Sequence, residues 1–202
     1  MEVALNNPVR TKLLDAALSV IRTKGYAGTT VDDICKAAGV TKGSFFHYYA
    51  SKEDLAIAAT DHFMAMANGL FGSAPFRLLD DPLDRLMGYI DLRASILGGP
   101  IWQFTCLLGT LVQETYETHP RIREACDRCI SSHAHDVMAD IVAAKAKYVP
   151  NADWSPEGVA FFTQATLQGS FILAKARNGP AIAVECVRHL RRYIEMLFNR
   201  DR

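Results

Sequence analysis

The chain has 202 residues, half of them hydrophobic, which is enough to build the core of one or two domains. Its 22 basic and 22 acidic side chains balance, so any nucleic-acid binding must come from a local arrangement rather than from bulk charge. We expect no signal peptide, no membrane span and no disulfide framework: the first ten residues lack a basic and an apolar region, no apolar run approaches roughly 20 residues, and the five cysteines are unevenly spaced. This pattern favours the reducing cytoplasm.

Apolar residues at helical spacing predict that almost the whole chain is helical. The first helix ends at Gly25, because glycine adopts a positive φ at no cost. Its apolar stripe consists of Leu13, Leu14, Ala17, Leu18 and Ile21. Two short helices follow, one ending at Gly39 and one running from a Thr41 cap to Tyr49, and a longer helix runs from Lys52 towards Phe71.

The stretch 72–82 is rich in Gly, Ser, Pro and Asp, and we interpret it as a junction between domains. It would separate a DNA-binding domain, 1–55 with a connecting helix of about 52–71, from a second domain at 72–202. Further helices are expected at about 82–98, 102–119, 120–147, 156–177 and 181–198. The last two have broad apolar faces, which is typical of helices that bury against another chain. The predicted fold class is all-α, an N-terminal three-helix helix-turn-helix domain followed by a C-terminal helical domain for ligand binding and dimerisation.

The segment 25–55 carries the clearest functional pattern. Two short helices joined by a glycine turn, behind a longer helix, form a helix-turn-helix, whose second short helix enters the major groove of DNA. Lys42, Gly43 and Ser44 lie at the start of that helix, where they can reach base edges and where the positive end of the helix dipole faces phosphate. Phe45 and Tyr49 are four residues apart and are expected to pack inward. The residues left facing outward are Phe46, His47 and Tyr48.

A set of residues in this segment forms a recognisable signature: Thr29, Thr30, Val31, Ile34, Ala38, Gly39, Val40, Thr41, Gly43, Tyr48, Tyr49, Ser51, Lys52 and Leu55. On these residues the segment resembles the tetracycline-repressor (TetR) family of bacterial transcriptional regulators. The resemblance implies that Thr30 contacts phosphate, that Lys42 and Ser44 read bases, and that His47, Tyr48 and Lys52 hold the DNA backbone. Phe46 departs from the usual tyrosine: it can meet a thymine methyl group but cannot donate a hydrogen bond to phosphate. Cys35 replaces the usual alanine and is expected in the core.

The same resemblance implies a homodimer that pairs through its last two helices and binds a pseudo-palindromic operator in double-stranded DNA. It also implies repression that ends when an inducer binds in the C-terminal domain, since linkage makes inducer and DNA weaken each other's binding. No cofactor is implied.

Several residues are candidates for the inducer sensor. Cys106 begins a C-x-x-G-x-x-x-x-E pattern similar to that of a TetR branch that answers electrophiles and oxidants, and Lys175 could supply the cation that activates the thiol. An inert core cysteine is the alternative. Aromatic residues either line a small-molecule pocket or belong to the core. They are Trp102, Phe104, Tyr116, Trp154, Phe161 and Phe162.

A metal sensor is a further alternative. Cys126, Cys129 and His133 are spaced i, i+3, i+7 on one helical face and could hold a transition metal. The pattern supplies no fourth ligand, and small residues on a packed helix are the better explanation.

Two other classes of protein are disfavoured. We expect no enzyme, because the chain has no nucleophile elbow, phosphate loop, dinucleotide fingerprint or H-E-x-x-H motif. The adjacent acids Asp32 and Asp33 point apart on a helix and cannot act as a dyad. A non-specific architectural DNA binder would need an excess of positive charge, which this chain lacks.

Overall fold

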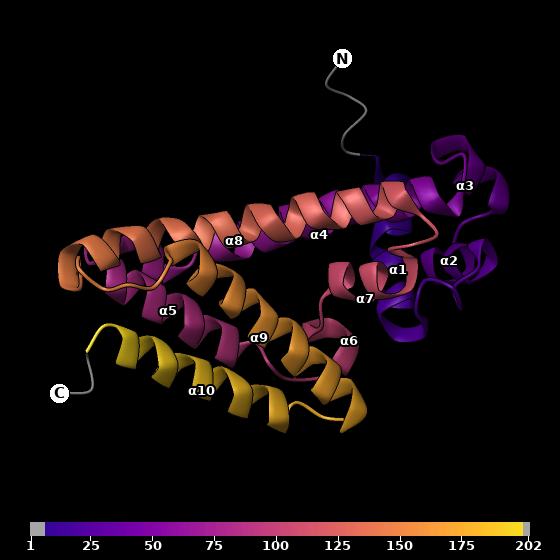
Figure 1. Ribbon diagram of the computed structural model, residues 1–202. Helices are drawn as coiled ribbons and strands as arrows, with labels where there is room; N and C mark the ends of the chain where they lie inside the picture. The colour runs from indigo at the N-terminus through magenta and orange to yellow at the C-terminus, as the bar shows by residue number, and fades with distance from the viewer. Residues whose placement is uncertain (1–6, 200–202) are drawn as a thin grey trace, which may run out of the picture. The chain divides into compact units, whose positions relative to one another are not determined.

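The computed structural model describes residues 7–199, and within this range every regular element is a helix (Figure 1). The residues form two compact units. Unit 1 contains the residues up to 68 together with 106–129, and unit 2 contains 69–105 together with the residues from 130 onward. The all-helical fold class is therefore confirmed. None of the described helices combines the length and the apolar character that a membrane span requires.

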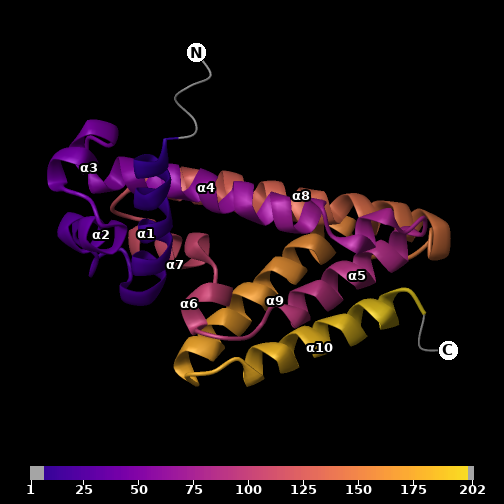
Figure 2. The same cartoon turned by 180° about the vertical axis from the view of Figure 1, so that it is seen from behind.

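Unit 1 contains the segment that the sequence assigns to DNA. Its helices are α1 (Pro8–Lys24), α2 (Val31–Ala38), α3 (Lys42–Tyr48), α7 (Leu107–Thr115) and the first parts of α4 (Lys52–Gly72) and α8 (Pro120–Tyr148). Figure 2 shows α7 beside α1, although the two are far apart in the sequence. This grouping adds residues 106–129 to the unit that contains the helix-turn-helix.

The core of unit 1 is built on the apolar stripe predicted for α1. All five of its residues are buried, and Ile34 of α2, Phe45 of α3 and Leu55 of α4 are completely enclosed. Ion pairs join α8 to the first part of α4: Arg121 lies 2.9 Å from Asp54 and 3.7 Å from Glu53, and Arg128 lies 3.1 Å from Asp61. These pairs are exposed and contribute little to stability, so the apolar contacts hold the unit together.

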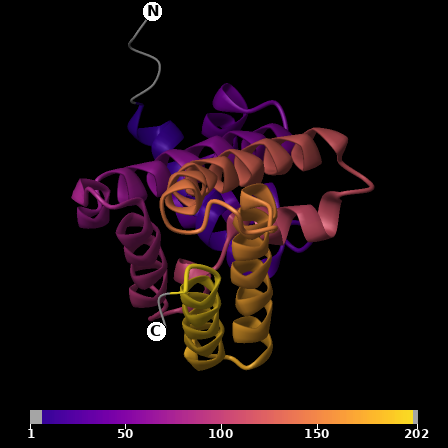
Figure 3. The same ribbon diagram turned by 60° about the vertical axis from the view of Figure 1, so that its left-hand side comes forward.

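Unit 2 contains a 3₁₀ turn and the remaining helices. They are η1 (Pro75–Leu78), α5 (Pro82–Ser95), α6 (Ile101–Phe104), α9 (Pro156–Ala176), α10 (Ala181–Leu197) and the second part of α8. Helices α9 and α10 lie side by side, as Figure 3 shows, and α10 also packs on α5. Asp81 caps α5 and Ser155 caps α9 through their side chains, and each precedes a proline in the first turn.

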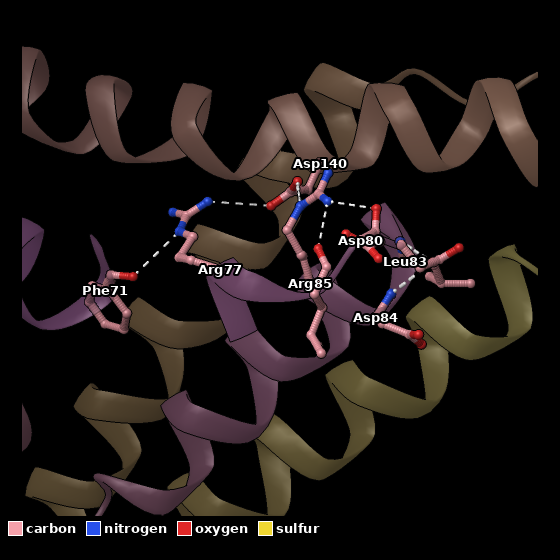
Figure 4. A network of polar contacts seen from close by, with 9 residues as sticks. Phe71, Arg77, Asp80, Leu83, Asp84, Arg85 and Asp140 are labelled. Carbon is pink, nitrogen blue, oxygen red and sulfur yellow. Dashed lines mark hydrogen bonds and ion pairs between the residues drawn. The ribbon is translucent and has the colours of Figure 1, made fainter. Parts of the chain in front are cut away.

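A buried carboxylate organises the start of α5 (Figure 4). Asp140 of α8 is 9% exposed and accepts from Arg85 at 2.7 Å and from Arg77 at 3.4 Å. Arg85 also donates to the backbone carbonyls of Leu79 and Asp80. Since burying a charge without partners is costly, this sharing of one carboxylate by two guanidinium groups fixes η1 and α5 against α8.

The structure differs from the predicted elements at two places. The helix expected at 102–119 is wrong, because it is broken into α6 and α7 by extended backbone at Thr105 (ψ 157°) and Cys106 (ψ 128°). Neither residue is glycine or proline, so the local sequence carries no signal for this break. The junction at 72–82 also contains the turn η1, whose Phe76 is buried.

Candidate nucleic-acid interface

Short polar side chains position the helix-turn-helix. Thr30 and Asp33 form a reciprocal capping box at the start of α2, where Thr30 Oγ1 accepts from the Asp33 amide at 3.1 Å and the Asp33 carboxylate accepts from the Thr30 amide. Gly39 ends α2 in the left-handed conformation, φ 65° and ψ 37°. Thr41 then caps α3 by accepting from the Ser44 amide. The turn therefore has one defined geometry before any DNA arrives.

Helix α3 divides its aromatic side chains between the core and the solvent. Phe45 is fully buried and Tyr49 is 6% exposed, as predicted. Phe46 is 55% exposed, His47 is exposed, and Tyr48 is half-buried with its ring centroid 4.8 Å from that of His47. The exposed aromatic face costs free energy in water, so it suits a surface that another molecule covers.

Gly43 lies in the first turn of α3 without any need for glycine inside the protein. A Cβ atom there would meet only the Thr41 hydroxyl, at an ordinary 3.6 Å, and the residue does not have a positive φ. Glycine in a helix is destabilising by roughly 0.5–1 kcal/mol relative to alanine. The absent side chain therefore leaves room on the outer surface of α3.

The lysines near this surface are paired with acids of the same unit. Lys42 lies 2.8 Å from Asp32, and Lys24 lies 2.7 Å from Asp33. The hydrogen bond from Lys42 to Asp32 raises the pKa of the ammonium group, so it stays charged. Because both groups of the Lys42–Asp32 pair are more than half exposed, the pair is weak and Lys42 can exchange its partner.

Lys52 is held differently from the other predicted contacts. Its ammonium group donates to the backbone carbonyls of Tyr26 at 3.0 Å and Thr29 at 2.9 Å, and it lies 4.1 Å from the centre of the Tyr26 ring. Burial lowers its pKa. The sequence reasoning missed this role, because nothing in the local pattern shows that the start of α4 lies against the loop before α2.

Helix α7 completes the loop between α1 and α2. Glu114 accepts from the backbone amide of Ala27 at 2.9 Å. Its carboxylate also occupies the space where a Cβ atom of Gly25 would lie, and Gly25 has a φ of 79°. The positive φ is the feature that requires glycine at position 25, since the Glu114 carboxylate is the far end of a flexible side chain. Cys35 is buried in this unit, as expected, and burial raises the pKa of its thiol.

The predicted sensor residues are spread over both units. Cys106 is half-buried at the start of α7 in unit 1 and caps that helix without a side-chain hydrogen bond. The cation that interacts with Cys106 there is Arg22 of α1: burial lowers the pKa of Arg22, and Cys106 opposes this effect. Lys175, the predicted partner, lies on the exposed side of α9 in unit 2.

The predicted aromatic pocket residues have separate environments. Tyr116 belongs to unit 1 and is 58% exposed. In unit 2, Trp102 is half-buried, while Phe162 is 47% exposed on α9 with its ring 4.8 Å from Tyr193 of α10. Of the other candidates, Phe104 is a core residue, Phe161 is 38% exposed, and Trp154 packs its ring on Phe198.

The alternative of a metal sensor is not supported. Within residues 7–199, no group of three or more His, Cys, Asp or Glu side chains is arranged to hold a metal ion. Cys126 and Cys129 are buried, and burial raises the pKa of the Cys126 thiol to about 12. The His133 Nε2 atom is occupied by Tyr89 and Arg93. The i, i+3, i+7 spacing thus reflects the buried side of α8.

Comparison with known proteins points in the same direction as this geometry. Residues 13–59 match the family model "Bacterial regulatory proteins, tetR family", and residues 82–190 match the model "Tetracyclin repressor-like, C-terminal domain". The chain is similar to the HTH-type transcriptional repressor DhaR of Mycobacterium sp. (strain GP1), with 26% identity over 83% of each chain. It is also similar to the transcriptional regulator AcuR of Cereibacter sphaeroides, with 27% identity over 83% of this chain and 77% of that protein. The crystal structure of a regulatory protein TetR from Rhodobacter sphaeroides superposes with a TM-score of 0.80 and 26% identity, over 92% of this chain and 98% of the other.

Proposed function

Because this chain belongs to the TetR family of bacterial transcriptional regulators, we propose that it represses transcription as a homodimer that binds a pseudo-palindromic operator and leaves it when an inducer acts. The outer surface of α3 carries this proposal. A short helix with an exposed Phe46, an exposed His47 and a glycine that the protein itself does not need at position 43 suits the major groove of DNA.

Each residue of this surface has a proposed role. Lys42 exchanges Asp32 for a base or a phosphate, and Ser44 reads a base edge beside it. Gly43 lets the DNA backbone approach, and Phe46 contacts a thymine methyl group. Thr30, His47 and Tyr48 contact phosphates. Lys52 supports the loop that ends at Thr30 instead of contacting phosphate directly, which is what its two carbonyl partners favour.

The proposed dimer forms through α9 and α10 of each copy. Large apolar side chains stay exposed on these two helices within unit 2, and a second copy would cover them. They are Phe161, Phe162, Ile172, Leu173, Tyr193 and Met196. Two copies related by a two-fold axis would present two α3 helices to two half-sites.

A gel shift with the DNA that flanks the gene of this protein tests the proposal. We expect a specific complex that a scrambled duplex does not compete away and that weakens steeply with salt. Phe46→Ala should reduce operator affinity at least tenfold. Leu78→Ala also truncates an exposed apolar side chain, but one in unit 2, and should leave operator affinity unchanged. Binding that ignores the DNA sequence would contradict the proposal.

Cys106 favours a thiol-reactive compound as one class of inducer. The thiol is half-buried at the start of α7, within the electrostatic reach of the Arg22 guanidinium. The sulfur of such a thiol is the atom that adds to an electrophilic carbon. Since α7 packs on α1 and on the loop before α2, a group attached to Cys106 would strain the helix-turn-helix from inside its own unit.

Alkylation with N-ethylmaleimide tests this assignment. The treated protein should release the operator, Cys106→Ser should keep it, and Cys186→Ser should behave like the unsubstituted protein because Cys186 lies on α10. Release of DNA by the Cys106→Ser variant after treatment would show that Cys106 is not the sensor.

A further inference from the structure

Unit 2 contains a polar cluster that the DNA-binding function does not use. Tyr89 and Arg93 of α5 face His133 of α8. The Tyr89 hydroxyl lies 2.9 Å from His133 Nε2, an Nη atom of Arg93 lies 2.6 Å from the same nitrogen, and Arg93 Nε donates to the Tyr89 oxygen at 2.9 Å. His133 is 7% exposed and Tyr89 is 3% exposed, whereas Arg93 is half-buried, so water reaches the cluster from the side of Arg93.

The cluster holds more hydrogen-bond donors than acceptors. A guanidinium group has five N–H donors and no acceptor, and Tyr89 adds an O–H. The cluster offers two acceptors, the Tyr89 oxygen and one lone pair of His133 Nε2. The Tyr89 hydroxyl and an Nη group of Arg93 both approach that lone pair. Three N–H groups of the half-buried Arg93 remain without an acceptor among the described residues. Among the described residues, no nitrogen of Arg93 is a buried atom without a partner, so these N–H groups reach solvent and are available to a ligand rich in acceptor atoms.

Arg93 also lacks a negative partner among residues 7–199. No carboxylate of the described residues lies within ion-pair distance of its guanidinium, whereas Arg85 has Asp140 and Arg191 has Asp91 in the same unit. The guanidinium lies 4.2 Å from the centre of the Phe71 ring and 5.2 Å from that of Tyr89. The rings hold it in place by cation–π contact without neutralising its charge.

The neighbours of the cluster do not supply the missing negative charge. Burial, then Arg93 and Arg77, lower the pKa of His133 to about 3, so this histidine is neutral near pH 7. Arg77 shares Asp140 with Arg85 (Figure 4), which leaves two guanidinium groups on one carboxylate. The surroundings of Arg93 are therefore electropositive, while its guanidinium stays partly exposed.

We propose that Tyr89, Arg93 and His133 form a binding site for the carboxylate group of a small organic acid. Arg93 presents its free N–H groups to the carboxylate oxygens, the Tyr89 hydroxyl turns from His133 to donate to the same group, and Phe71 contacts the apolar part of the acid. A planar guanidinium fork matches a planar carboxylate, and one uncommitted cation matches one negative charge, which favours a carboxylate over phosphate.

The site adds a chemical class of inducer to the proposed function. Binding of the acid does not depend on that function, but release of DNA on binding rests on it. The acid would join the middle of α5 to α8 in unit 2. If the bound form of unit 2 fits the operator less well, the acid lowers DNA affinity, and DNA lowers the affinity for the acid by the same factor.

Calorimetric titration of the full chain with matched pairs of acids and amides tests the site. The probes are propionate, hexanoate and benzoate, each with its amide, and inorganic phosphate at equal ionic strength. We expect at least one acid to bind, with its amide at least tenfold weaker because it lacks the charge. Failure of all three acids, or equal binding of acid and amide, would overturn the proposal, and equal binding of phosphate would overturn the carboxylate assignment.

Three variants locate the site. Arg93→Met should lower the affinity for the bound acid at least tenfold, and Tyr89→Phe, which keeps the ring, should lower it severalfold. Arg177→Met removes an exposed guanidinium from the same unit and should bind as the unsubstituted protein does. Circular dichroism and the melting temperature identify a variant that fails to fold, in which case Tyr89→Phe decides. Unchanged affinity in a folded Arg93→Met or Tyr89→Phe variant would contradict the site.

A gel shift run with the same acid separates this proposal from the proposed function. Acid binding without release of DNA would keep the site and show that it is not the inducer site. Acid binding by a protein that forms no specific DNA complex would keep the site and contradict the repressor.

Discussion

Two residues of the helix-turn-helix, Gly43 of α3 and Lys52 of α4, have different proposed roles: the first leaves room for DNA, and the second stabilises the fold. A Cβ atom at Gly43 would meet only an ordinary contact, so we propose that this glycine serves the bound partner. Gly43→Ala should therefore raise the free energy of unfolding by about 0.5–1 kcal/mol, because alanine favours the helix. It should also weaken operator binding at least tenfold, because the methyl group occupies the space of the DNA backbone. Urea unfolding and gel shifts measure the two effects, and a variant that binds DNA normally would remove the proposed close approach.

Lys52 is expected to stabilise the fold without contacting DNA. Lys52→Met removes two hydrogen bonds to the carbonyls of Tyr26 and Thr29, and should lower the free energy of unfolding by about 2 kcal/mol. The slope of operator affinity against salt should stay the same, because no phosphate contact is lost. Lys42→Met is the matched comparison, and its slope should fall by about one. A fall of about one in the Lys52 variant would instead assign that lysine to phosphate.

At the scale of elements, α5 and α8 are joined by a histidine that resists protonation. The pKa of His133 is lowered from 6.5 to about 3 in the folded chain, so the unfolded chain binds more protons between these values. The contribution of neutral His133 to the free energy of unfolding is therefore fully present above about pH 6.5. Below that pH it falls by about 1.4 kcal/mol per pH unit. Urea unfolding between pH 7.5 and 5 measures this loss. His133→Gln, which keeps an acceptor, should flatten the profile, and His135→Gln, an exposed control, should not.

Elements with local signals could be predicted from the sequence, and contacts between distant segments could not. The α1 stripe, the Gly39 end of α2, the Thr41 cap of α3 and the burial of Phe45 and Tyr49 are all as expected, because each depends on helical spacing or on a single cap. The break at Thr105 and Cys106 was missed because neither residue disfavours a helix strongly. Arg22 beside Cys106 and the carbonyl partners of Lys52 depend on tertiary packing that no motif encodes.

At the scale of the whole molecule, the proposed recognition of the operator depends on the pairing of two copies. Phe162→Glu places a charge on the exposed apolar face of α9 and should prevent the proposed dimer, because the charge would lose its water. Sedimentation should show a monomer, and affinity for the two-half-site operator should fall at least a hundredfold. Leu78→Glu, a charge on an exposed site of η1, should stay dimeric. A Phe162→Glu variant that remains a dimer would place the interface elsewhere.

The contact between Glu114 and the backbone of Ala27 has a consequence for the design of chimeric proteins from this chain. The family model of the DNA-binding part ends at residue 59, whereas α7 lies within the range of the C-terminal model. Leu107, Leu108 and Leu111 of α7 are nevertheless buried in the unit that contains α1. A chimeric regulator that takes only residues 1–68 from this chain would leave the α7-facing side of α1 open to water and the Ala27 amide without its acceptor. A transplantable DNA-reading module must therefore carry both pieces, 1–68 and 106–129, joined by a new connection.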